Sequence, residues 1–245
     1  MSIESNENNP VRPTATIEVW SDVACPWCYI GKRRFAAALD AFPGRDRIEV
    51  VWRSYQLAPD TPVGARRGEL EALVEQKGMP ADQVRGMFAH VAATGAADGL
   101  VLDFDTVIAA NTFDAHRLLH LAGERRDAVL EALFRAHFTD GRVIDDRAVL
   151  VEIAAEAGLD VDEVRAALGS DVAADLVRAD LEEARRLGVT GVPFFVANRQ
   201  LAVSGAQPTS VFTELLRRAL ERNDGDDDAA PGGTAEGCSD DGCAI

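Results

Sequence analysis

The sequence predicts an α/β fold in which a large all-helical insertion lies between the second and third strands of the sheet. Two changes of hydrophobic pattern along the chain predict this fold. Residues 16–55 have strand-like patterns at both ends and helical spacing between them, whereas residues 61–187 keep the helical period of about 3.6 residues. Strand patterns return after Gly188. We therefore expect a β-α-β unit, a helical insertion and a ββα unit, in that order.

The first unit begins with a strand at residues 16–21, where β-forming apolar residues alternate with polar ones. A helix follows directly, because Pro26 has the φ angle of a first helical turn and lacks only an N–H group that would be unpaired there. The helix is expected to end before Pro43, and residues 47–55 are expected to form the second strand.

Glycines separate the expected helices of the insertion. These helices are expected at residues 69–77, 81–93, 113–122, 128–137, 146–157 and 170–187. After the insertion, strands at residues 192–196 and 200–203 are expected to form a hairpin with a polar tip. Residues 208–222 are expected to form an amphipathic helix.

Four regions follow from these patterns. Residues 16–60 and 188–222 are expected to form one α/β domain, and residues 61–187 to form the insertion, whose last helix packs on the sheet. Residues 1–15 are polar and are expected to be disordered. Residues 223–245 hold seven acidic residues, no basic ones and a Pro-Gly-Gly break, which predicts a flexible acidic tail.

The composition argues against two classes of protein. The 245 residues are 47% hydrophobic, but no apolar run approaches the ~20 residues that span a bilayer. The net charge of −16 repels nucleic-acid phosphates. The N-terminus lacks the apolar core of a secretory signal, so we expect a cytoplasmic protein with reduced thiols. The acidic, lysine-poor composition fits a salt-rich cytoplasm or a biased genome composition equally well.

The sequence Cys25-Pro26-Trp27-Cys28 lies where the first strand passes into the first helix. The unpaired N–H groups and the positive dipole end of a helix favour a thiolate, which makes Cys25 the candidate nucleophile. Cys28 follows three residues later on the same face of the first turn. It can therefore attack a mixed disulfide formed at Cys25 and release the product.

Two other interpretations of the cysteines are a zinc site and an inert buried pair. Cys238 and Cys243 form a second close pair, so the four cysteines together resemble a set of zinc ligands. Against zinc, the first pair opens a helix and encloses Pro-Trp instead of small, flexible residues. We expect neither a metal nor an organic cofactor.

A second candidate feature is Val192-Pro193 at the start of the third strand. A cis bond here would turn the carbonyl and N–H groups of Val192 outward, where they could pair with an extended peptide. An ordinary trans proline that begins a strand is the more frequent arrangement.

Three further polar residues have two interpretations each. Asp22 is either a turn residue or a proton relay for the nearby thiols. His116 and His120 share one face of a helix, where they either pack against the α/β domain or bind a metal. Turn formation and packing are the more frequent roles for such residues.

Four motifs carry a resemblance to a known family. They are residues 21–31 (SDVACPWCYIG), 111–117 (NTFDAHR), 188–195 (GVTGVPFF) and 203–207 (VSGAQ). Together with the order of elements over residues 16–222, they resemble the DsbA-like oxidoreductases, and within them the cytosolic FrnE-type branch. The resemblance implies a thioredoxin-like fold and a cis Pro193 beside the thiols. It also implies redox exchange with a cysteine pair in the tail.

The expected function is thiol-disulfide oxidoreductase or isomerase activity on protein disulfides, protein dithiols or small thiols. Cys25 and Cys28 would be catalytic, and Pro26, Trp27, Val192 and Pro193 would bind the substrate. Cys238 and Cys243 would form an auxiliary redox pair. No pattern in the sequence favours a particular oligomeric state.

Two alternatives remain open at this point. One is a glutathione-dependent transferase or an enzyme like 2-hydroxychromene-2-carboxylate isomerase, which shares this architecture but places a serine at the position of Cys25. The other is a metal-binding or chaperone-like interaction protein.

Overall fold

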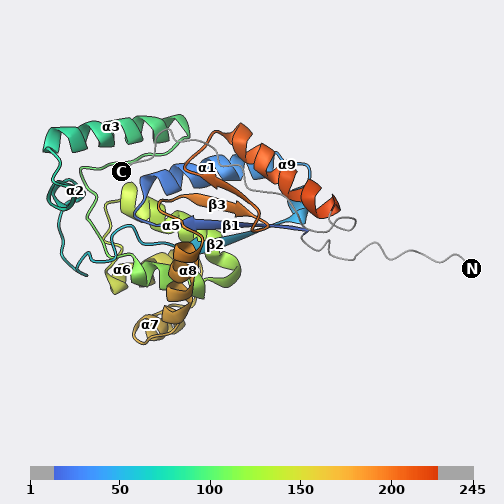
Figure 1. Ribbon diagram of the computed structural model, residues 1–245. Coiled ribbons are helices and arrows are strands. Elements are labelled where there is room, and N and C mark those ends of the chain that lie inside the picture. The colour runs from blue at the N-terminus through green and yellow to red at the C-terminus, as the bar shows by residue number, and fades with distance from the viewer. Residues whose placement is uncertain (1–13, 226–245) are drawn as a thin grey trace, which may run out of the picture.

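A four-stranded sheet with helices on both faces forms the centre of the molecule (Figure 1). The structure is a computed structural model and describes residues 14–225. The strand order is β2-β1-β3-β4, with β1 parallel to β2 and β3 antiparallel to both of its neighbours. The strands are β1 (Ala15–Ser21), β2 (Ile48–Ser54), β3 (Phe194–Ala197) and β4 (Leu201–Ser204).

Two helices cover one face of this sheet, α1 (Pro26–Asp40) and α9 (Thr209–Gly225) (Figure 1). Alternation along β1 turns Ile17 and Val19 toward them, and both side chains are fully buried. An aromatic cluster joins the three elements: the rings of Phe195 and Phe212 lie 4.5 Å apart, and Phe35 lies within 5.6 Å of both. This cluster fixes α1 over the strand that precedes it.

The chain between β2 and β3 is helical. Its helices are α2 (Glu69–Lys77), α3 (Ala81–Ala97), α4 (Phe113–Leu121), α5 (Arg126–Phe138), α6 (Arg147–Glu156), α7 (Val161–Leu168) and α8 (Ala174–Arg186), with a short 3₁₀ turn at Gly123–Arg125 before α5. A second 3₁₀ turn, Arg45–Arg47, lies outside the insertion, between α1 and β2. Leu118, Leu133 and Phe134 are fully buried in the core of this insertion. The α/β fold with a helical insertion between the second and third strands is thus confirmed. Within the described residues, no helix is both long and apolar enough to cross a membrane.

The C-terminal part of the insertion differs from the sequence prediction. The helix expected at residues 170–187 is present as α8 but starts only after Ala173, whose φ is 62°, and it is preceded by α7, where no helix was expected. Asp160 caps α7, because its side chain accepts hydrogen bonds of 2.9 Å from the second and third helical N–H groups. This cap at Asp160 is the feature of the sequence that indicates a helix at α7.

The third strand also begins later than predicted, at Phe194 instead of Val192. Pro193 has no N–H group to contribute to a strand ladder, so the regular pairing starts after it. The predicted tip of the following hairpin is present, with Asn198 and Arg199 at positive φ values of 49° and 57°.

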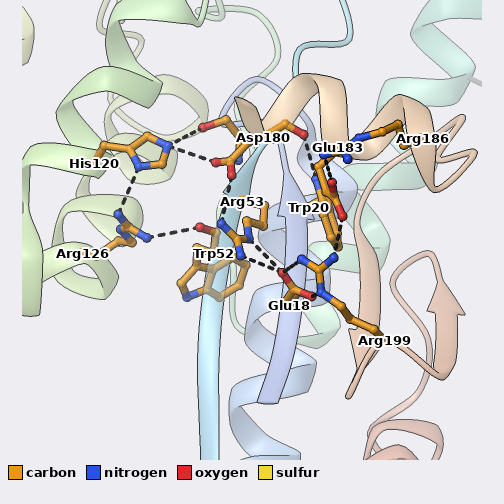
Figure 2. A network of polar contacts seen from close by, with 11 residues as sticks. Glu18, Trp20, Trp52, Arg53, His120, Arg126, Asp180, Glu183, Arg186 and Arg199 are labelled. Carbon is orange, nitrogen blue, oxygen red and sulfur yellow. Dashed lines mark hydrogen bonds and ion pairs between the residues drawn. The ribbon is translucent and has the colours of Figure 1, made fainter. Parts of the chain in front are cut away.

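A buried carboxylate holds α8 against the other face of the sheet (Figure 2). Asp180 is 3% exposed and accepts a hydrogen bond of 2.9 Å from the Ser54 N–H group. His120 Nε2 lies 3.0 Å from the same carboxylate, and Arg53 Nη1 lies 3.2 Å from it. The Trp20 indole N–H donates to the Asp180 carbonyl at 3.2 Å. One residue therefore joins α8 to α4, β1 and β2.

His120 also contacts α5 through its second nitrogen. Arg126 Nη2 lies 3.3 Å from His120 Nδ1, whereas His120 Nε2 faces Asp180 at 3.0 Å. Arg126 also donates to the Trp52 carbonyl at 3.3 Å (Figure 2). The first turn of α5 is thereby attached to β2, the strand that Asp180 of α8 also contacts.

Glu18 extends this set of contacts toward the hairpin (Figure 2). It is 4% exposed and accepts a hydrogen bond of 2.7 Å from Arg53. Arg199 at the hairpin tip bonds Glu18 at 3.0 Å and Glu183 of α8 at 2.6 Å. The last helix of the insertion is therefore fixed to the sheet and the hairpin at its middle, through Asp180, and near its C-terminal end, through Glu183.

Replacement of Asp180 by asparagine should destabilise the fold in a pH-dependent way. Burial would raise the pKa of this carboxyl, but the hydrogen bonds from His120 and Ser54 and the charges of His120 and Arg53 hold it below its usual value. Its stabilising effect is then present above the unfolded pKa of about 3.9 and is lost as the pH falls through the lower folded pKa. We expect Asp180→Asn to lower the free energy of unfolding by about 2–4 kcal/mol at neutral pH.

The control for this variant is Asp175→Asn, which removes an exposed carboxylate from the same helix. Urea denaturation from neutral to acid pH measures both. The cost of Asp180→Asn should shrink below about pH 4, whereas Asp175→Asn should cost less than about 0.5 kcal/mol throughout. Equal costs for the two variants would contradict the role given to Asp180.

Gly31 lies where α1 approaches the loop before β3. A Cβ atom at this position would lie 2.8 Å from Cγ of the Pro193 ring, which is too close. We expect Gly31→Ala to destabilise the protein by about 1–3 kcal/mol through this overpacking. The matched control is Gly86→Ala in α3, where a Cβ atom would meet nothing within 4 Å. Thermal denaturation should show a gain of about 0.5–1 kcal/mol for the control, and similar shifts for both would refute the close contact.

Candidate active site

The two cysteines of the first motif lie on the first turn of α1. Cys25 is the N-cap residue with extended backbone angles, and Pro26 is the first helical residue, as predicted. The Cys28 N–H group donates to the Cys25 carbonyl at 3.0 Å. Both thiols are reduced, with Cys25 4% exposed and Cys28 fully buried. The helix therefore holds both sulfurs on one turn, with Cys25 nearer to the surface.

Cys28 and Cys25 have different electrostatic surroundings. Burial raises the pKa of the Cys28 thiol well above its usual value, and the hydrogen bond and negative charge of Cys25 raise it further. The Ser21 hydroxyl and the Asp22 N–H group act in the opposite direction. Cys28 therefore keeps its proton at neutral pH.

The loop before β3 lies directly against the thiols. The Val192–Pro193 peptide bond is cis, and the Cys25 Sγ atom donates to the Val192 carbonyl at 3.6 Å. The Pro193 carbonyl accepts a hydrogen bond of 2.8 Å from the Gly205 N–H group, which attaches the loop to the end of β4. The fold therefore brings Val192 and Pro193 together with Cys25, as the resemblance implies.

Pro26 and Trp27 lie beside Cys25 and are half-buried. The Trp27 ring is tilted against His90 of α3, with 6.1 Å between the ring centroids. The Tyr29 side chain packs in the core instead of facing a substrate, because its ring stacks on the Phe134 ring with 4.8 Å between the centroids. Trp27 is thus the aromatic side chain of the motif that can contact a substrate.

Asp22 and His116 form a buried pair behind the thiols. Asp22 accepts hydrogen bonds from the Leu57 N–H group at 2.8 Å and from the Ala24 N–H group at 3.3 Å, so it orders the turn before Cys25. His116 Nε2 lies 3.4 Å from the Asp22 carboxylate. His120, one turn later, faces Asp180 instead. Both histidines pack against the α/β domain, and among the described residues no three acidic, histidine or cysteine side chains gather as a metal site would require.

A cavity of about 260 Å³ opens beside Cys25. We call it the active-site cavity. The first turn of α1, the Val192 loop and helices α2 and α3 surround it. Its apolar wall consists of Leu73, Met87, Phe88, Val91, Phe104 and Phe138. Its charged lining residues within the described chain are Asp22, Glu69 and Lys77. An enclosed apolar space with a few polar groups is the usual form of a small-ligand site.

The sequence analysis did not identify Glu69. It is the first residue of α2, and burial, followed by the charge of Asp22, raises its pKa to about 7. In the sequence it resembles Glu71, because acidic residues are common in a first helical turn. The folded arrangement alone distinguishes the two, since Glu69 lines the cavity and Glu71 is exposed. Cys238 and Cys243 lie outside the described residues.

Known proteins share this arrangement. The family profile for the DsbA-like thioredoxin domain matches residues 16–217. A probable DsbA oxidoreductase from Streptomyces coelicolor is 46% identical in sequence, with a TM-score of 0.79 over 94% of this chain and 99% of that chain. It is a relative by sequence as well as by fold.

Two more distant structures share the fold. The cytosolic disulfide reductase DsbM of Pseudomonas aeruginosa, solved with GSH, has a TM-score of 0.58 at 22% identity and covers 84% of this chain and 99% of that chain. A 2-hydroxychromene-2-carboxylate isomerase has a TM-score of 0.64 at 14% identity over 87% of this chain and 100% of that chain.

The predicted resemblance and the thioredoxin-like fold are therefore confirmed. The site and the sequence point to the same relatives, and the family match supports an oxidoreductase. The chain belongs to the family of DsbA-like thioredoxin-domain proteins.

Proposed function

We propose that this protein is a thiol-disulfide oxidoreductase that uses Cys25 and Cys28 as its redox pair. The observation that carries the proposal is the asymmetry of the two sulfurs on one helical turn. Cys25 lines the active-site cavity, whereas Cys28 is fully buried behind it and keeps its proton. A disulfide exchange needs a first thiol that the substrate can reach and a second thiol that stays protected until the first exchange is complete.

The reduction of a substrate disulfide proceeds in two exchanges. The Cys25 thiolate attacks one substrate sulfur, the substrate S–S bond breaks, and the departing thiolate takes up a proton. Cys28 then loses its proton and attacks Cys25 Sγ, which releases the second substrate thiol and leaves a Cys25–Cys28 disulfide. The Ser21 hydroxyl and the Asp22 N–H group stabilise the Cys28 thiolate during this step. The reverse sequence oxidises a dithiol.

The Val192 loop provides a binding edge for the substrate. The Val192 carbonyl accepts a hydrogen bond from the Cys25 thiol, and the Val192 N–H group makes no hydrogen bond among the described residues. An extended segment of a protein substrate can pair with this edge, with Pro26 and Trp27 beside the reacting sulfur. The cytosolic DsbM neighbour supports a cytosolic setting.

A second candidate function is a glutathione-dependent transfer or isomerisation. The active-site cavity favours it, because its volume and apolar wall suit a small organic molecule. The fold likeness to DsbM with GSH and to the isomerase points the same way. Cys28 argues against it, since such reactions need no resolving thiol.

Serine replacements at the two cysteines distinguish these functions. In an insulin-reduction assay, Cys25→Ser should lower activity by at least about two orders of magnitude, because the attacking sulfur is lost. Cys28→Ser should stop turnover after the first exchange and accumulate a mixed disulfide at Cys25, visible by mass spectrometry. Insulin reduction that survives Cys25→Ser would contradict the proposed function. Full activity of Cys28→Ser on an isomerase substrate would support the alternative.

We also propose that Cys238 and Cys243 exchange disulfides with the Cys25–Cys28 pair. This proposal rests on the sequence, since both residues lie outside the described part of the chain. If residues 226–238 behave as a flexible chain, their end-to-end distance would be about 20 Å, which would give effective concentrations of order mM.

Trapping tests this exchange. In oxidised Cys28→Ser, non-reducing peptide mapping should find a disulfide between Cys25 and one tail cysteine. The same variant with Cys238→Ser and Cys243→Ser is the control, and it should show no such species. If the tail disulfide is missing from Cys28→Ser as well, the tail takes no part.

A further inference from the structure

Glu69 presents an unpaired carboxyl group to the active-site cavity. The side chain makes no hydrogen bond or ion pair within the described residues, although it lines the same cavity as Cys25. Its backbone is fixed: the Glu69 N–H group donates to the Val107 carbonyl at 2.9 Å, and the Ala109 N–H group donates to the Arg67 carbonyl at 2.9 Å. The carboxyl group is thus held at the cavity wall without a partner.

The charges around Glu69 favour a positive ligand. Asp22 lines the same cavity, and burial together with its charge raises the pKa of Glu69 to about 7. A positive group that enters the cavity would therefore find Glu69 ready to ionise near neutral pH, with a second carboxyl group close by.

Lys77 is the only cationic residue among the described residues that line the cavity, and two further titratable groups near Asp22, His137 and Tyr55, are neutral at pH 7. Burial lowers the pKa of His137 on α5 to about 4, so it is neutral at pH 7. Burial and the charge of Asp22 raise the pKa of Tyr55, which is also neutral. Lys77 lies eight residues from Glu69 on α2, about 12 Å along the helix axis, and is exposed. Within the described chain, no cationic side chain is hydrogen-bonded to or ion-paired with the Glu69 carboxyl group, although Lys77 lines the same cavity.

We infer that the active-site cavity selects disulfides that carry a primary ammonium group, which Glu69 binds while a sulfur of the disulfide meets Cys25. This inference rests on the proposed oxidoreductase function and names its substrate class. The ammonium makes a charge-assisted hydrogen bond to Glu69. The alkyl stem that joins it to the sulfur lies against Phe88 and Phe104, which stack at 4.3 Å in the wall.

The reaction of an amino disulfide balances in two exchanges. Cys25 forms a mixed disulfide with one half and releases the other half as an aminothiol. Cys28 then attacks Cys25 and releases the second aminothiol. Two electrons pass from the cysteine pair to the substrate sulfurs, and the two protons lost by the cysteines end on the two aminothiols. No further reductant is required for one turnover.

Long-range attraction is the competing explanation for a preference for cations. The net charge of −16 attracts any positive ligand, whichever carboxylate is removed. Such attraction is screened beyond about 8 Å in ~0.15 M salt, whereas a direct contact with Glu69 is screened much less. Glu71→Gln removes one acidic group from the exposed side of the same helical turn and is the matched control for Glu69→Gln.

The test compares two symmetric disulfides of similar length, cystamine with two ammonium groups and bis(2-hydroxyethyl) disulfide with none. The rate constant for oxidation of the reduced protein is measured by tryptophan fluorescence in ~0.15 M salt. The cystamine preference is the ratio of the two rate constants. We expect the cystamine preference of Glu69→Gln to be about tenfold lower than that of the wild type and of Glu71→Gln. A factor of about ten corresponds to the free energy of a hydrogen bond to a charged group.

The pH dependence gives a second readout. Because the ammonium groups of cystamine stay largely charged up to about pH 8, the cystamine preference should rise between about pH 6 and pH 8 as Glu69 ionises, and Glu69→Gln should abolish this rise. The thiolate fraction of Cys25 affects both disulfides alike and cancels in the ratio. An equal loss of preference in both variants, or a preference without this pH dependence, would overturn the inference.

Peptide disulfides identify the source of the ammonium group. Two peptides that differ by Lys or Gln beside the half-cystine are compared in the same assay. A Glu69-dependent preference for the Lys peptide assigns the site to protein substrates, and a preference confined to cystamine assigns it to small aminothiols. If neither the Lys peptide nor cystamine shows a preference that depends on Glu69, the inference is overturned. If bis(2-hydroxyethyl) disulfide fails to oxidise the wild type at all, the proposed oxidoreductase function fails instead.

Discussion

The contact between the first turn of α1 and the Val192–Pro193 loop is the constraint on which the site depends. It follows from the sheet register: β1 and β3 are antiparallel, with Trp20 opposite Phe194. The end of β1 and the start of β3 therefore lie side by side, and the residues just beyond them meet. Gly31 lets the helix approach the proline ring closely enough for Cys25 to reach the Val192 carbonyl.

The helical insertion contributes two different things to this arrangement. At the α8 side, the buried Asp180 and its partners join the insertion to the sheet without leaving room for a ligand. At the α2 and α3 side, the insertion stands away from the first turn of α1 and encloses the active-site cavity. The α/β part of the chain thus carries the reacting sulfurs, and the insertion determines which molecules reach them.

Local patterns were sufficient to predict the reactive part of the site. The strand alternation, Pro26 at a helix start and the cysteine spacing are each encoded within a few residues, so Cys25 and Cys28 could be placed before the fold was known. Glu69 could not, because its role depends on a cavity formed by segments far apart in the chain. The α7 helix differs again: it is only eight residues long, so few positions show its helical period, and Asp160 is its capping residue.

The unequal protonation of the two thiols is the central claim, and thiolate absorbance near 240 nm tests it most directly. The reduced protein with Cys238→Ser and Cys243→Ser is titrated alone and with Cys25→Ser or Cys28→Ser added. The account predicts that the first thiolate to form on raising the pH is lost in the Cys25→Ser protein and retained in the Cys28→Ser protein. A first thiolate that persists without Cys25 would place the charge on Cys28 and contradict the account.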